Sequence, residues 1–255
     1  MWRRYRHWCR TRRVARSPLP DPAWHRAMDQ PLFRYLDAKE RQTLRFLATA
    51  FSLEKPIVGA EAFSPSPPVV ATIAAQACLL ILALDLDWYR EVTSVVLYPD
   101  DFLVPLSYTD DAGVIHSTVE TCSGEAWQRG PVVLSWRTVT DPLATGFATG
   151  YHVVVHEFAH QLDLLSGDAN GCPPLHGGLS PARWQRTFAA AFADFQRRQP
   201  PPFDDYAGED PSEFFAVASE CFFASPHTLA NAYPEVYNLL VAFYRQDPKS
   251  RLPRA

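Results

Sequence analysis

Two histidines placed four residues apart, His156 and His160, constrain most strongly what this chain can fold into. On an α-helix such a pair projects from one face, so both imidazoles can reach one ion at about 2.0–2.1 Å. Apolar residues at 153–155 and at Leu162 place one side of that helix against a core, and Gly167 is expected to end it. The pattern therefore predicts a metal-binding helix packed on a hydrophobic core.

Glu157 follows the first of these histidines. In a His-Glu-x-x-His helix this glutamate takes a proton from water activated by zinc, which is the chemistry of a metallopeptidase. We therefore predict one zinc ion per chain and a peptide or protein substrate. His152, one turn earlier, is expected to be a helix-start or surface histidine. Asp163, three residues after His160, is expected either to orient that imidazole or to be a solvated acid at the helix end.

A catalytic zinc ion needs a third protein ligand and keeps its fourth position open. A metzincin pattern is excluded because Asp163 and Ser166 stand where it needs glycine and histidine. Two glutamates, Glu213 and Glu220, share a face of a later apolar helix, where buried charges need partners. By spacing alone, Glu213 is equally a ligand or the third residue of a capping box that starts at Asp210, and Glu220 is a weaker ligand candidate.

The remaining periodicity predicts a helix-rich α+β domain with a small mixed sheet placed before the metal-binding helix. Apolar residues at helical spacing predict an amphipathic helix through 31–36 and 44–47 and a buried helix at 69–88. Short β-branched runs predict strands. The expected strands are residues 92–98, 114–119 and 132–136, and further helices are expected at 181–197, 211–223 and 233–246.

The first 28 residues are predicted to form a disordered basic tail and linker before one domain at 29–255. The first 16 residues contain seven arginines and no acid, whereas residues 17–255 carry 17 basic and 28 acidic side chains. A short arginine-rich segment beside prolines is typical of a solvated tail. We therefore expect neither nucleic acid nor membrane as a direct partner.

The five cysteines are scattered and form no C-x-x-C pair, so neither a disulfide framework nor a cysteine zinc cluster is indicated. No apolar segment of an export signal follows the N-terminal arginines. The longest apolar stretch, at 69–84, has 16 residues, whereas a membrane span needs about 20. These features predict a cytoplasmic location.

Six different short motifs follow one another along the chain, at residues 124–128, 130–136, 156–163, 167–171, 210–217 and 243–248. Together they resemble the Mlc titration factor A family of bacterial zinc peptidases, which is similar around the metal to the catalytic domain of anthrax lethal factor. The resemblance extends over about residues 30–252. The arginine-rich start departs from the family, and so does Gln161, which stands where lysine is frequent.

The resemblance implies Glu213 as the third zinc ligand and Tyr206 as the tyrosine that stabilises the oxyanion or protonates the leaving group. It also implies that His116 occupies the fourth zinc position at rest. Alternation places His116 on the polar face of its predicted strand, where a solvated histidine is the other interpretation.

The resemblance further implies a zincin-like domain with aminopeptidase-like activity that also binds an Mlc-like repressor of sugar uptake. The alternative is a non-catalytic protein that sequesters the repressor and retains the zinc site. We also expect the strand at 132–136 to pair with an extended substrate at a sheet edge.

Overall fold

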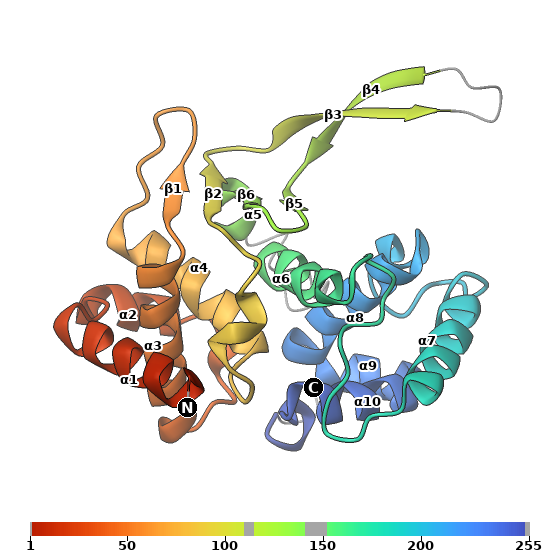
Figure 1. Ribbon diagram of the computed structural model, residues 1–255. Helices are drawn as coiled ribbons and strands as arrows, with labels where there is room; N and C mark the ends of the chain where they lie inside the picture. The colour runs from red at the N-terminus through yellow and green to blue at the C-terminus, as the bar shows by residue number, and fades with distance from the viewer. Residues whose placement is uncertain (1, 110–114, 141–151, 253–255) are drawn as a thin grey trace.

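The computed structural model describes residues 2–109, 115–140 and 152–252, and only the backbone of residues 2–4, 103–109 and 115–122 (Figure 1). Its α-helices are α1 Trp2–Arg16, α2 Asp21–Met28, α3 Ala38–Glu54, α4 Pro67–Leu80, α5 Trp136–Thr140, α6 Val153–Asp163, α7 Pro181–Phe195, α8 Pro211–Ala224, α9 Pro226–Ala232 and α10 Pro234–Tyr244. Short 3₁₀ helices are η1 Pro31–Phe33, η2 Leu86–Tyr89, η3 Leu164–Ser166, η4 Asp205–Gly208 and η5 Pro248–Ser250.

A four-stranded mixed sheet lies along one side of these helices (Figure 1). Its order is β1 (Ile57–Gly59), β2 (Val95–Tyr98), β6 (Val132–Ser135) and β5 (Gly124–Ala126). The first three strands are parallel, and β5 runs antiparallel to β6. The predicted helix-rich α+β class with a small mixed sheet is therefore confirmed.

The position of β6 corrects one prediction about the sheet. Residues 132–136 were expected to offer an edge to an extended substrate, but β6 pairs with β2 on one side and with β5 on the other. The edge strand on this side of the sheet is β5, a short segment that has no β-branched residue to reveal it.

Helix α6 is held at the centre of the molecule by its own apolar residues. It packs on α4, α8, β5 and β6. Phe158, which lies between the two histidines of the motif, is fully buried. Its ring lies 5.6 Å from that of Phe51 on α3 and 4.9 Å from that of Tyr89 on η2, so the metal-binding motif is part of the aromatic core.

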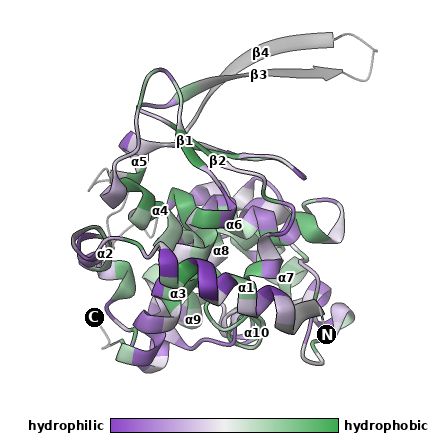
Figure 2. Cartoon of the chain, turned by 60° about the vertical axis from the view of Figure 1, so that its left-hand side comes forward, coloured by the Kyte–Doolittle hydropathy of each residue, from purple (hydrophilic) through white to green (hydrophobic). Residues whose placement is uncertain are grey.

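The buried helix predicted at 69–88 is divided in two. Helix α4 ends at Leu80, and a separate turn, η2, begins at Leu86 because the Asp85 carboxylate accepts a hydrogen bond from the Asp87 N–H at 2.8 Å. Helix α4 is apolar on nearly all sides and is buried, and it appears green in Figure 2. No helix in the described ranges has the length and apolarity to cross a bilayer.

The structure also differs from the disordered tail that composition predicts at residues 1–28, since residues 2–28 contain α1 and α2. Helix α1 is largely hydrophilic (Figure 2), but Arg10 pairs with Glu54 at 2.7 Å and with Asp87 at 2.9 Å. Helix α2 buries Trp24 against the core. Composition alone missed these partners because the acids lie 44 and 77 residues further along the chain.

We expect Arg10→Ala to lower the free energy of unfolding by about 1.5–3 kcal/mol, because it removes charged hydrogen bonds to half-buried acids. Arg16→Ala, at the exposed end of the same helix, is the control and should change it by less than about 0.5 kcal/mol. Urea unfolding of both variants measures the difference. Equal effects would show that Arg10 does not dock α1.

Candidate metal centre

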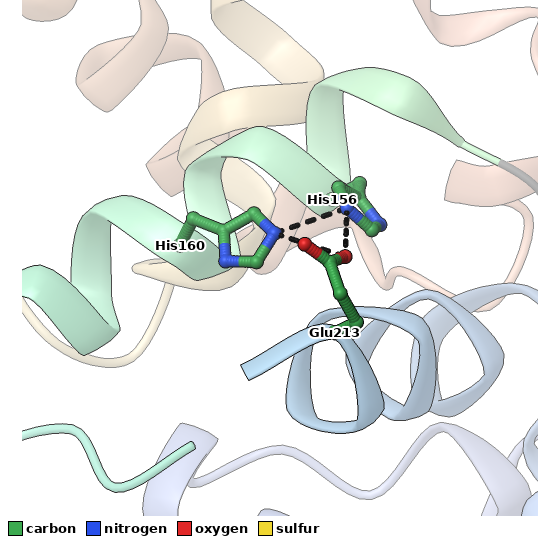
Figure 3. A group of neighbouring side chains, drawn as sticks. All are labelled: His156, His160 and Glu213. Carbon is green, nitrogen blue, oxygen red and sulfur yellow. Dashed lines mark hydrogen bonds and ion pairs between the residues drawn. The ribbon is translucent and has the colours of Figure 1, made fainter. Parts of the chain in front are cut away.

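Three side chains from two helices converge on one point (Figure 3). His156 and His160 project from α6, and Glu213 projects from the first turn of α8. The Nε2 atoms of the two histidines lie 3.1 Å apart. Oε2 of Glu213 lies 3.0 Å from Nε2 of His156 and 3.3 Å from Nε2 of His160. One ligand atom from each residue lies within 4.8 Å of the others, which is the spacing of a shared metal ion.

The donor set fits a zinc ion. Oε2 of Glu213 is buried, and although it is near both imidazoles it has no partner with hydrogen-bond geometry among the described residues. Burial acts to raise the pKa of Glu213, but His156 and His160 outweigh it and lower this pKa to about 2. An ionised carboxylate and two imidazole nitrogens that face one point match the His₂Glu ligand set that is typical of catalytic zinc sites.

Glu220 fixes the orientation of the first imidazole. It is almost completely buried on α8, two turns after Glu213, and its Oε1 lies 2.8 Å from Nδ1 of His156. Its other oxygen accepts a hydrogen bond from the backbone N–H of His152. Because an ionised carboxylate can only accept, Nδ1 carries the proton and Nε2 of His156 presents its lone pair to the metal point.

A hydroxyl relay fixes the second imidazole. Nδ1 of His160 lies 3.0 Å from Oγ of Ser212, and this hydroxyl donates to Oδ2 of Asp163 at 3.3 Å. The same carboxylate oxygen accepts the backbone N–H of Gly171 at 2.7 Å. Asp163 is fully buried, so of the two interpretations the solvated acid does not apply, and Asp163 reaches His160 only through Ser212.

At the start of α8, the residue that caps the helix and the residue that faces the two histidines are different. Asp210 is the N-cap, and its Oδ1 accepts hydrogen bonds from the N–H groups of Ser212 at 2.7 Å and Glu213 at 3.0 Å. Pro211 occupies the first helical position, where a missing N–H costs nothing. Asp210 supplies the side-chain cap, and the Glu213 side chain is directed toward the two histidines.

Glu157 lies beside this group under the edge strand β5. It is 6% exposed, and burial raises its pKa against the opposing influence of His156 and His160. The backbone of Gly124 lies so close that a Cβ atom there would be 2.3 Å from Oε1 of Glu157. Only glycine at position 124 lets the carboxylate and the strand pack in this way.

A cavity of about 310 Å³ opens above these residues between β5, α6, η4 and the start of α8. Tyr206 borders it from η4, with half of its side chain exposed and its ring 6.0 Å from the ring of His156. The cavity therefore brings together five of the six site residues that the sequence predicts: Glu157, Tyr206, His156, His160 and Glu213.

Two further histidines were considered in the sequence, His116 as the sixth site residue and His152 as a helix-start or surface residue. His116 belongs to β4 (Ile115–Cys122), which pairs with β3 (Phe102–Thr109) in a hairpin that extends from the body (Figure 1). Its side chain is outside the described part of the structure, so a resting zinc ligand at His116 stays a prediction. His152 is at the start of α6, as expected, but it is buried rather than on the surface.

Sequence reasoning missed Ser212 and Gly124 and left Glu220 as a ligand candidate. A signal existed for Glu220, because a charge in an apolar helix needs a partner, but spacing could not say which atom that partner offers. No sequence signal distinguished Ser212 from an ordinary helix-start serine or Gly124 from a turn glycine.

A helix with two histidines, joined by a glutamate of a later helix, is the metal centre of the metallopeptidase class. The family model described as glucose-regulated metallo-peptidase M90 matches residues 5–245, and the chain belongs to this family. The chain is 35% identical over 234 residues to Mlc titration factor A of Klebsiella pneumoniae, which covers 89% of this chain and 87% of that protein. It is 36% identical over 241 residues to the protein of that name from Salmonella schwarzengrund, with 91% and 89% covered.

We expect Glu220→Gln to weaken zinc binding roughly 10–100-fold, because an amide presents a weaker acceptor to His156 Nδ1. Competition with a fluorescent zinc chelator measures the affinity. Glu209→Gln, an exposed glutamate beside η4, is the matched control and should bind zinc as the parent does. Unchanged affinity in Glu220→Gln would exclude an orienting effect of this carboxylate.

Proposed function

We propose that the protein is a zinc-dependent peptidase that hydrolyses peptide bonds with water. The observation that carries this proposal is the convergence of His156, His160 and Glu213 in the cavity that also contains Glu157. A structural zinc site would leave Glu157 without a function and would normally use a closed, cysteine-rich ligand set.

His156, His160 and Glu213 would hold the zinc ion. A bound zinc ion supplies Lewis-acid chemistry, which polarises the peptide carbonyl and lowers the pKa of a water molecule. Glu157 takes the proton of this water as its oxygen adds to the carbonyl carbon. Glu157 then gives the proton to the amide nitrogen, the C–N bond breaks, and the products carry a new carboxylate and a new amine.

Tyr206 is proposed to donate a hydrogen bond from its hydroxyl to the oxyanion of the tetrahedral intermediate. Its position at the wall of the same cavity as Glu157 supports this assignment. We further propose that the cleavage is aminopeptidase-like. We also propose that the protein acts in the cytoplasm, in agreement with the free thiols of Cys9, Cys78, Cys172 and Cys221.

A second candidate function is binding of an Mlc-like transcription repressor, and the printed name of the relatives favours it. Binding and hydrolysis can coexist in one protein, because a repressor surface need not include the zinc cavity. The non-catalytic alternative requires binding without any dependence on Glu157.

We expect Glu157→Gln to retain one zinc ion per chain and to lower kcat about 10²–10⁴-fold, because the amide cannot accept the proton of water. Zinc content by mass spectrometry and cleavage of amino-acid p-nitroanilides and short peptides measure the two effects. Glu61→Gln, on an exposed turn, serves as the control. Full activity in a zinc-loaded Glu157→Gln protein would refute the mechanism.

The same variant separates the two functions. Capture of a purified Mlc repressor on immobilised Glu157→Gln should equal capture on the parent protein if binding is independent of catalysis. If the wild-type protein captures the repressor but cleaves no peptide, the result would support sequestration and refute the peptidase function.

A further inference from the structure

Trp127 is unusual among the large apolar side chains, most of which are buried. In the part of the chain with described side chains, five large hydrophobic residues are strongly exposed: Tyr5, Trp8, Val58, Trp127 and Tyr206. One of these, Tyr206, borders the cavity, and another, Trp127, directly follows β5, whose residues line another part of it. The side chain of Trp127 is 53% exposed.

The backbone of Trp127 is nevertheless fixed. Its carbonyl accepts hydrogen bonds from the N–H of Gly130 and from Nε2 of Gln161, both at 3.2 Å. Gln161 is buried and immediately follows His160 on α6, so Trp127 is tied to the metal-binding helix. A Cβ atom at Gly130 would lie 2.8 Å from Cβ of Trp127, so glycine there leaves room for the tryptophan.

A second tie holds the same turn. The side-chain amide of Gln128 donates to the carbonyl of Gly167, which follows η3 at the far end of α6. Arg129 adopts a left-handed conformation with φ of 53°, which closes the turn between β5 and β6. The exposed indole thus stands on a turn that is fixed at two points, to Gln161 on α6 and to Gly167 after η3, and its exposure does not come from a loose loop.

The distance between Trp127 and the reaction centre follows from strand geometry. Gly124 lies against the Glu157 carboxylate, and Trp127 is three residues further along the same extended segment. At about 3.3 Å per residue this is about 10 Å. Because β5 is the edge of its sheet, an extended peptide can add to it as a further strand, and it would reach Trp127 with a residue about three positions from the bond over Glu157.

We propose that Trp127 is a specificity-determining residue whose indole packs on a large apolar side chain of an extended peptide bound along β5. Fixed, exposed aromatic residues beside an unpaired strand edge are the kind of anchor that dominates peptide binding. The proposal rests on the proposed peptidase function, because it takes the peptide in the cavity as a substrate.

The test uses the Glu157→Gln protein, so that bound peptides stay intact. The probes are alanine- and glutamine-based nonapeptides with a free N-terminus and a C-terminal fluorescein, in which one leucine occupies each position in turn. Fluorescence anisotropy gives the dissociation constants. We expect a leucine about three positions from the cleaved bond to tighten binding. Trp127→Ala should weaken binding of that peptide about tenfold and change binding of the same peptide without leucine less than twofold.

Two controls keep the test specific. Trp8→Ala removes a tryptophan of similar exposure on α1, outside the cavity, and should leave binding unchanged. Trp127→Phe keeps an aromatic ring and should restore most of the preference for leucine, which a general loss of folding would not allow. Loss of preference in Trp8→Ala, or an unchanged preference in Trp127→Ala, would overturn the proposal.

Failure of this inference is distinguishable from failure of the proposed function. If the wild-type protein cleaves peptides and its preference for leucine is unchanged in Trp127→Ala, the inference is refuted and the peptidase function stands. Peptide binding that depends on Trp127, in a wild-type protein that cleaves nothing, would refute the peptidase and leave Trp127 as a peptide-binding residue.

Discussion

The packing of helix α6 against helix α8 is the constraint on which the site depends. Each helix contributes apolar residues to a common core and polar residues to the narrow space between them. Phe158 fixes α6 against α3 and η2, and Phe214 fixes α8 within a cluster of aromatic rings that includes Phe188 and Phe195. Since close-packed interiors tolerate little displacement, His156, His160 and Glu213 are held together by residues that never touch a metal.

Burial of these polar groups makes each hydrogen bond matter. An unpaired carboxylate or imidazole in the core costs free energy, so the buried Glu220 and Asp163 persist because they have donors. Glu220 accepts from His156 and from the backbone N–H of His152. Oδ2 of Asp163 accepts from the backbone N–H of Gly171 and from the Ser212 hydroxyl, which contacts Nδ1 of His160. Both links place the imidazole proton on Nδ1 and leave Nε2 for the metal, so a requirement of stability and a requirement of metal binding are met by the same contacts.

The sequence predicted the parts of the site that depend on local periodicity. His156 and His160 share a face because a helix repeats every 3.6 residues, and residues 153–163 form that helix. Spacing could not decide whether Glu213 faces the histidines or caps its own helix, because both outcomes occur in the first turn. The structure separates them, because Oε2 of Glu213 lies 3.0 Å from Nε2 of His156 and 3.3 Å from Nε2 of His160.

The parts that sequence patterns missed depend on contacts between distant residues. Strand β5 is a sheet edge only because β6 pairs with it and with β2, and nothing in residues 124–126 specifies that order. Helix α1 is ordered because acids on α3 and η2 pair with its arginines. Composition shows that the segment is basic, but it does not show which acidic residues lie next to it in the fold.

The central claim is that one zinc ion lies between α6 and α8, and anomalous X-ray diffraction at the zinc absorption edge tests it most directly. Crystals of the zinc-loaded protein should show one strong anomalous peak about 2.0–2.2 Å from Nε2 of His156, Nε2 of His160 and a carboxylate oxygen of Glu213. The absence of a peak there, or a peak bound by other residues, would contradict the account.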